Sequence, residues 1–98
     1  MPVYIVARID IQDREAYARY EAGFMDILNQ HPGQILSVDE APTVLEGEWP
    51  HTRTVLLQFE TQQAALDWYQ SEAYQNLAKH RFAASTGHVA MLAGLPAA

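Results

Sequence analysis

Apolar residues alternate with polar or small residues along five short stretches of the chain, and this period of two is typical of β-strands. The predicted strands are residues 3–10, 34–39, 43–48, 53–59 and 88–93. Residues 53–59 are the most strand-like of these, with Val55, Leu57 and Phe59 on one face. A turn at Ala41-Pro42 is expected to join the second and third strands as a hairpin.

Between these strands the apolar residues recur at helical spacing. Asp13 is a predicted N-cap for a first helix that runs through Gln30, and His31-Pro32-Gly33 ends it. The apolar stripe of this helix is Tyr17, Tyr20, Phe24, Ile27 and Leu28. Thr61 and Ser71 are predicted to cap two further helices. The residues expected to face inward from these two helices are Ala64, Ala65, Trp68, Tyr69, Tyr74, Leu77 and Ala78.

The order β-α-β-β-β-α-β predicts an α+β fold close to the ferredoxin-like split βαβ plan with an added hairpin. At 98 residues, the chain has the size of a single domain, residues 1–98. Helices can cover only one face of the sheet, yet the strands carry apolar residues on both faces. Those on the second face are Tyr4, Val6, Leu56, Ala90 and Leu92. An open apolar face marks an association site, so we expect a homodimer that packs sheet against sheet.

Composition narrows the range of partners. The formal net charge is -6, and the six basic residues are scattered, which disfavours nucleic acids and anionic membranes as partners. There is no cysteine, so disulfides and thiolate chemistry are excluded. The sequence shows no signal-peptide pattern and no apolar run of about 20 residues, the length that a spanning helix needs. A cytoplasmic location is therefore expected.

Three segments and one arginine carry a resemblance to a known family. The segments are DREAYARY at residues 13–20, LEGEWP at 45–50 and AALDWYQSEAY at 64–74, and the arginine is Arg81. With them the chain resembles the domain-of-unknown-function 1330 family over nearly its whole length. This resemblance implies a dimeric α/β barrel, related in fold to small cofactor-free monooxygenases, muconolactone isomerases and chlorite-dismutase-like proteins. It implies no established activity.

Glu46 is the first candidate for chemistry, because in its predicted strand it lies among Thr43, Val44, Leu45 and Gly47. A carboxylate in such a place faces a polar cavity or needs a cationic partner. Arg53 and Arg81 are the candidate partners. Glu46 would then be a general base or substrate anchor beside an arginine that binds a carboxylate. The alternative is a structural ion pair at the edge of the sheet.

Four aromatic residues form a second candidate group. Trp49, Trp68, Tyr69 and Tyr74 would line a pocket between helices and sheet, with tyrosine hydroxyls orienting a small ligand. The alternative is ordinary core packing, which is the better interpretation for Trp68 because it lies on an amphipathic stripe.

The four histidines do not predict a metal site. They are far apart in sequence, without the spacing of ligands, so no metal and no bound cofactor are expected. His80 is the best acid–base candidate because it is next to Arg81. The alternative, an exposed helical histidine, is the better interpretation.

Two functional hypotheses follow from these candidates. The first is a metal-free enzyme acting on a small carboxylated or aromatic compound. Glu46 or His80 would move a proton, Arg53 or Arg81 would bind the anionic group, and Tyr74, Tyr69 and Trp49 would line the site. The second is a non-catalytic dimeric module for ligand binding or structure, in which the same groups hold the barrel together.

Overall fold

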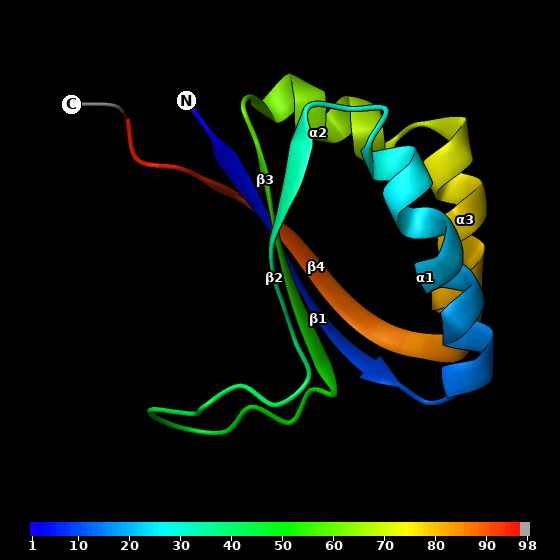
Figure 1. The fold of residues 1–98 in the computed structure, drawn as a ribbon. Coiled ribbons are helices and arrows are strands. Elements are labelled where there is room, and N and C mark those ends of the chain that lie inside the picture. The colour runs from blue at the N-terminus through cyan, green and yellow to red at the C-terminus, as the bar shows by residue number, and fades with distance from the viewer. Residues whose placement is uncertain (97–98) are drawn as a thin grey trace.

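The computed structural model describes residues 1–96 and shows an antiparallel sheet with helices on one face (Figure 1). Within these residues the four strands lie in the order β2-β3-β1-β4. The elements are β1 Val3–Ile11, α1 Arg14–Leu28, β2 Gly33–Asp39, β3 Arg53–Phe59, α2 Gln62–Tyr69, α3 Glu72–Ala84 and β4 Ser85–Ala93. This arrangement confirms the α+β, ferredoxin-like fold expected from the sequence.

The core lies between the sheet and the helical layer. In β1, alternate side chains point to the helices, and Val3, Ile5 and Ile9 are all buried there. The inner strand β3 contributes Leu57 and Phe59, and Ile5 lies directly opposite Leu57 in the register of the two strands. The buried residues from the helices include Tyr17, Leu28, Trp68, Tyr74 and Ala78.

All three predicted N-caps are confirmed. The Asp13 carboxylate accepts a hydrogen bond from the backbone N–H of Ala16 at 3.0 Å. The Thr61 and Ser71 hydroxyls accept from the backbone N–H groups three residues later, at 3.0 and 3.2 Å. Each cap satisfies a donor that the first helical turn leaves free, so the starts of the helices are fixed locally.

The predicted strand at residues 43–48 is wrong, and with it the added hairpin. These residues belong to an extended loop between β2 and β3, where Val44 and Leu45 are exposed. The Asp39 carboxylate accepts a hydrogen bond from the backbone N–H of Ala41 at 2.8 Å, which turns the chain out of the sheet. Gly47 has φ of 75°, a left-handed conformation that is incompatible with a strand.

Two strand boundaries differ from the prediction by a few residues. β4 begins at Ser85 rather than at His88, because its first residues pair with the end of β1, with Ser85 opposite Ile11. β2 begins at Gly33, opposite Phe59 of β3. A Cβ atom at position 33 would overlap the Phe59 ring, so a glycine is needed where β2 enters the sheet.

The second face of the sheet is uncovered in the part of the chain that the structure describes. The helices all lie on one side, and the loop between β2 and β3 extends away on the other (Figure 1). Leu92 is 52% exposed on the uncovered face, where Ala90 is also exposed. Among residues 1–96, no helix is long and apolar enough to cross a membrane.

Candidate small-molecule site

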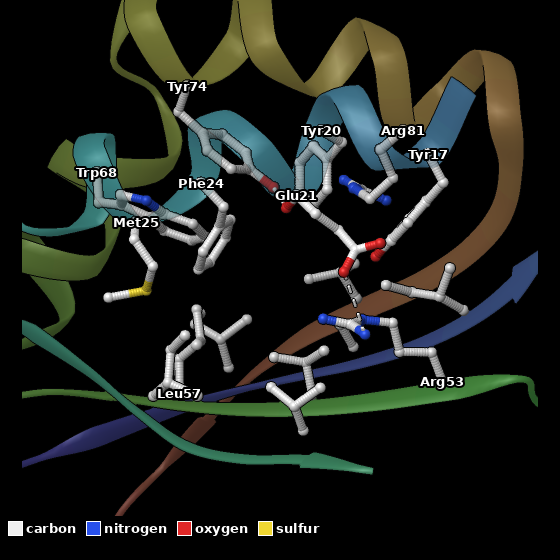
Figure 2. A pocket seen from close by; sticks show the side chains of 17 residues that line it. Tyr17, Tyr20, Glu21, Phe24, Met25, Arg53, Leu57, Trp68, Tyr74 and Arg81 are labelled. Atoms are coloured by element: carbon white, nitrogen blue, oxygen red, sulfur yellow. Dashed lines mark hydrogen bonds and ion pairs between the residues drawn. The ribbon is translucent and has the colours of Figure 1, made fainter. Parts of the chain in front are cut away.

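A cavity of about 140 Å³ lies between the helices and the covered face of the sheet. One end is apolar and the other is polar (Figure 2). The labelled side chains of the apolar end are Phe24, Met25, Leu57 and Trp68. Those of the polar end are Tyr17, Tyr20, Glu21, Arg53, Tyr74 and Arg81. Met25, Val38 and Val89 line the cavity and are themselves partly exposed, so the cavity opens to solvent.

Two buried tyrosines are joined by their hydroxyl groups inside the cavity. The Oη atoms of Tyr20 and Tyr74 are 2.8 Å apart, although the residues are 54 positions apart in the sequence. Burial, and then the nearby Tyr74 hydroxyl, raise the pKa of Tyr20. Burial likewise raises the pKa of Tyr17, although Arg53 acts in the opposite direction. The phenols of Tyr17 and Tyr20 therefore stay protonated at neutral pH and serve as hydrogen-bond donors rather than as bases.

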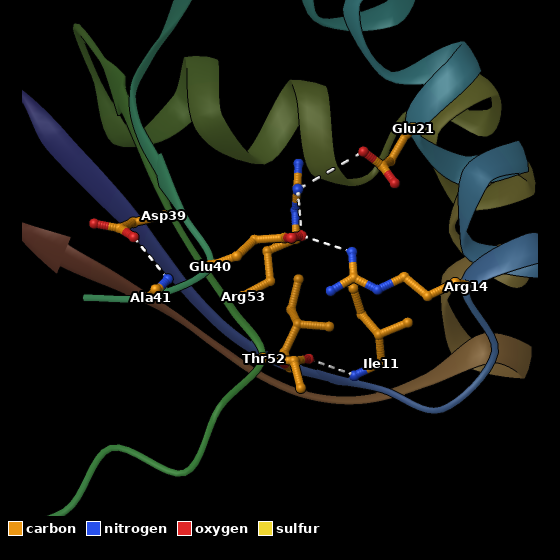
Figure 3. A network of polar contacts seen from close by, with 9 residues as sticks. Ile11, Arg14, Glu21, Asp39, Glu40, Ala41, Thr52 and Arg53 are labelled. Atoms are coloured by element: carbon orange, nitrogen blue, oxygen red, sulfur yellow. Dashed lines mark hydrogen bonds and ion pairs between the residues drawn. The ribbon is translucent and has the colours of Figure 1, made fainter.

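Arg53 enters the cavity from the first residue of β3 and belongs to an ion-pair network (Figure 3). Its Nη1 donates to the Glu40 carboxylate at 3.1 Å and lies 3.7 Å from Oε2 of Glu21. Arg14 Nη1 donates to the same Glu40 oxygen at 2.8 Å. The network therefore holds two cations and two carboxylates, and the charge of Arg53 is compensated within the protein.

Replacing Glu40 with glutamine is expected to destabilise the fold in a pH-dependent way. Hydrogen bonds from Arg14 and then Arg53 lower the pKa of the Glu40 carboxyl below its ordinary value of 4.5. A lowered folded-state pKa adds stability that is present above the unfolded value and is lost as the pH falls through the folded value. Because Glu40 is partly exposed, we expect Glu40→Gln to cost only about 0.5–1 kcal/mol at pH 7.

Chemical denaturation at pH 7 and at lower pH measures this difference. The gap between wild type and Glu40→Gln should shrink as the pH falls from about 5 to about 3. Glu60→Gln is the matched control, since Glu60 is exposed and has no ion pair among residues 1–96. A gap that is independent of pH would contradict this account of Glu40.

Two buried donors at the cavity have no hydrogen-bond partner among the described residues. They are Nε of Arg53 and Nε1 of Trp68. Native proteins pair most of their buried polar groups, so an unpaired donor at a cavity is an observation that requires an explanation. An acceptor atom of a ligand would satisfy either group.

Three of the predicted binding residues meet at this cavity. Arg53, Tyr74 and Arg81 come from β3 and α3, and all three line it. Tyr69 is half-buried at the end of α2, with its ring 5.5 Å from that of Tyr74, and it does not line the cavity. It supports the wall rather than forming it.

Glu46 is not part of this group of residues. It is exposed in the loop between β2 and β3, not in a strand, and it does not line the cavity. Arg53 pairs with Glu40 and Glu21 instead of Glu46, because the chain turns out of the sheet just after Glu40. A catalytic role for Glu46 stays a prediction and requires a site at the loop itself.

Trp49 lies on the other side of the sheet from the cavity. Its indole N–H donates to the Thr54 hydroxyl at 2.9 Å, and the Arg8 guanidinium lies 5.9 Å from the centre of the ring. Arg8 and Thr54 are cross-strand partners whose side chains alternate with the cavity-facing ones, so they mark the uncovered face. The predicted role of Trp49 in binding is therefore a role at that face.

His80 is exposed on α3 and is not among the residues that line the cavity, although its neighbour Arg81 is. Its acid–base role also stays a prediction. Within residues 1–96, no three or more His, Asp or Glu side chains are grouped so that they could hold a metal ion.

Sequence reasoning missed Glu21 as a cavity residue and Glu40 as the partner of Arg53. Glu21 follows the inward-facing Tyr20 on α1, and this adjacency was the only signal of its position. The position of Tyr17 and Tyr20 on the apolar stripe of the first helix favours core packing. Both are indeed buried, and both also line the cavity.

The chain was compared with known families and structures. A family profile described as "Domain of unknown function (DUF1330)" matches residues 2–95. Among curated proteins, none matches the chain.

Several solved structures share the fold. A protein of unknown function from Rhodopseudomonas palustris is 17% identical with a TM-score of 0.80, over 98% of this chain and 84% of that one. A dimeric ferredoxin-like protein of unknown function from Jannaschia sp. is 16% identical with a TM-score of 0.70, over 96% and 100%. SnoaB, a cofactor-independent oxygenase from Streptomyces nogalater, is 17% identical with a TM-score of 0.64, over 98% and 95%. At these identities the likeness is one of fold alone.

Proposed function

The chain belongs to the DUF1330 family, described as a domain of unknown function, and from that premise we propose that its cavity binds a small organic compound. One observation carries the proposal: a cavity with an apolar end and a polar end opens to solvent within a packed core. Such concave, mostly apolar sites with a few convergent polar groups are the usual form of ligand sites. The unpaired Nε1 of Trp68 supports a ligand that carries a hydrogen-bond acceptor.

We propose further that the protein acts on this compound as an enzyme without a metal. Glu21 is the carboxylate at the cavity and is the candidate to accept a proton from the ligand. The hydroxyl groups of Tyr20 and Tyr74 are candidates to donate hydrogen bonds to a developing negative charge. The similarity in fold to a cofactor-independent oxygenase supports this hypothesis by analogy only.

The alternative is a dimeric binding module without catalysis. It is favoured by the positions of Glu46 and His80, the two expected catalytic residues, which do not line the cavity. Incubating a bound compound with wild type and with Glu21→Gln under air separates the two functions. Conversion detected by mass spectrometry and lost in Glu21→Gln supports the enzyme, whereas binding without conversion supports the module.

We propose that two copies pair through the uncovered face of the sheet. Val6, Leu56 and Ala90 form a row of apolar residues across three strands of this face, and Leu92 lies beside it. A monomer rarely leaves such an apolar face open to water. The dimeric ferredoxin-like protein from Jannaschia supports the pairing by analogy.

Blocking the mouth of the cavity is expected to abolish ligand binding. Val38 lines the mouth and is 43% exposed, so a tryptophan there can cover the opening without overpacking the core. Thermal shift with a library of small carboxylates, aromatics and lactones measures binding. A ligand at a hundred times its Kd adds about 2.7 kcal/mol, which raises the Tm of a chain of this size by about 10 °C or more.

Leu36→Trp is the matched control for Val38→Trp. Leu36 lies on the same strand, is 45% exposed and does not line the cavity. A compound that stabilises wild type and Leu36→Trp but not Val38→Trp would support the cavity as the site. Equal stabilisation of all three proteins would place the ligand elsewhere and contradict the proposal.

A further inference from the structure

Arg81 is the one buried charged residue among residues 1–96, with 4% of its surface exposed. It comes from α3 and points into the polar end of the cavity (Figure 2). Burial by itself would lower the pKa of its guanidinium, but the neighbouring Tyr74 and Tyr20 oxygens raise it overall. The side chain therefore keeps its positive charge at every physiological pH.

The surroundings of Arg81 do not compensate this charge. Its guanidinium carbon lies 5.7 Å from the centre of the Tyr20 ring and 4.8 Å from that of Phe82. No carboxylate within residues 1–96 forms an ion pair with Arg81, whereas Arg53 pairs with both Glu40 and Glu21. Aromatic faces attract a cation, but they carry no negative charge that would neutralise it.

The backbone leaves room for this guanidinium at one position of β4. A Cβ atom at Gly87 would lie 3.0 Å from Nη1 of Arg81, closer than an ordinary van der Waals contact. The glycine therefore leaves space for the guanidinium beside the strand. The fold accommodates a buried cation, yet among residues 1–96 it places no carboxylate within ion-pair distance of it.

The charges around the cavity leave one positive charge over. Arg14 and Arg53 are balanced by Glu21 and Glu40, whereas Arg81 has no such partner in the described part of the chain. A buried charge without a counter-ion is costly, so a protein keeps one mainly where a bound ligand supplies the opposite charge. The missing partner is a single negative charge at the polar end.

We infer that Arg81 binds the acidic group of the ligand, and that this ligand is a carboxylate with a single negative charge and an apolar body. The inference rests on the proposed binding function and names its ligand class. A guanidinium presents a planar fork of donors that matches a carboxylate. In the Tyr20–Tyr74 pair one hydroxyl proton is used between the two oxygens and the other is free for the ligand. At about 140 Å³, the cavity has nearly the volume of one that holds a benzene ring.

Benzoate and its neutral isostere benzamide test the inference in isothermal titration calorimetry. Wild type is expected to bind benzoate about tenfold or more tightly than benzamide, as hydrogen bonds to a charged group predict. Arg81→Gln should abolish this preference by weakening benzoate alone and leaving benzamide within about twofold. Arg19→Gln is the matched control, because Arg19 is exposed, forms no ion pair among residues 1–96 and does not line the cavity, and it should keep the preference.

A second variant tests the same residue without removing its charge. Gly87→Ala forces the end of the Arg81 side chain to shift by a few tenths of an ångström, so benzoate binding should weaken about twofold or more while benzamide binding stays unchanged. Circular dichroism checks that each variant is folded. If Arg81→Gln is unfolded, the result for Gly87→Ala decides the test.

Each contrary result has a distinct meaning. Equal affinities of wild type for the two probes would overturn the inference and leave the cavity as a binding site. The preference for benzoate could instead survive in Arg81→Gln and be lost in Arg53→Gln. That result would assign the carboxylate of the ligand to Arg53 and overturn the inference. If Arg81→Gln does not fold, Gly87→Ala takes its place in this comparison. Binding of neither probe, together with no hit from the library, would overturn the proposed binding function and the inference together.

Discussion

Ala90→Glu is expected to convert the proposed dimer into monomers. Ala90 lies on the uncovered face of the sheet, opposite Val6 in the register of β1 and β4. In a sheet-to-sheet dimer this residue is buried, and two-fold symmetry places two copies of the new carboxylate close together. An unpaired buried charge costs about 3–5 kcal/mol, so the Kd should rise about a hundredfold or more.

Sedimentation equilibrium of wild type and the variant over a range of concentrations measures this effect. Ala18→Glu is the matched control, because Ala18 is an exposed alanine on the outer side of α1 and the change in charge is the same. The control should remain dimeric. A wild type that is monomeric at all concentrations would contradict the dimer, and a dimeric Ala90→Glu would place the interface elsewhere.

Trp68→Ala is expected to remove about 3–5 kcal/mol from the free energy of unfolding. Trp68 is 2% exposed, and its ring centre lies 4.3 Å from that of Tyr74 and 5.4 Å from that of Phe59. Truncation leaves a void beside the existing cavity, and the packed rings around it cannot close the space. Against a typical total stability of about 5–15 kcal/mol, the loss brings the protein close to unfolding at room temperature.

Urea denaturation at one fixed protein concentration measures this loss, because dimerisation makes the stability depend on concentration. Trp68→Phe is the informative control. It keeps a ring in the core and removes only part of the volume and the Nε1 donor, which has no partner among the described residues. We expect it to cost less than about 1.5 kcal/mol. An equally large loss in both variants would contradict the expectation that a phenylalanine ring fills most of the space at this position.

The order and type of most elements were predictable from the sequence because they depend on neighbouring residues. Period-two alternation marked β1 and β3, and the polar residues Asp13, Thr61 and Ser71 marked the helix starts. The family profile over residues 2–95 confirms the resemblance seen in the sequence motifs. The open face of the sheet was predictable for the same reason, since one helical layer cannot cover two apolar faces.

The strand predicted at residues 43–48 shows where local pattern failed. Thr43, Val44 and Leu45 have strand propensity, but a strand also needs a partner edge, and the Asp39 turn and Gly47 direct the chain away from β2. The interpretation of Glu46 depended on this strand. Once the strand is a loop, the reason for a cationic partner disappears, and Glu40 pairs with Arg53 instead.

The sequence by itself determined the α+β architecture and the capped helices, and it named Arg53, Tyr74 and Arg81 as candidate binding residues, three side chains that line one cavity. Only the tertiary structure decided which arginine has its charge compensated by carboxylates and which two tyrosines form a hydrogen bond with each other. Arg53 meets Glu21 and Glu40, and Tyr20 meets Tyr74 across 54 residues, through the packing of α1 and α3 against the sheet. Such long-range contacts depend on three-dimensional packing, which local spacing does not encode. They leave Arg81 as the cavity arginine without an ion-pair partner among residues 1–96.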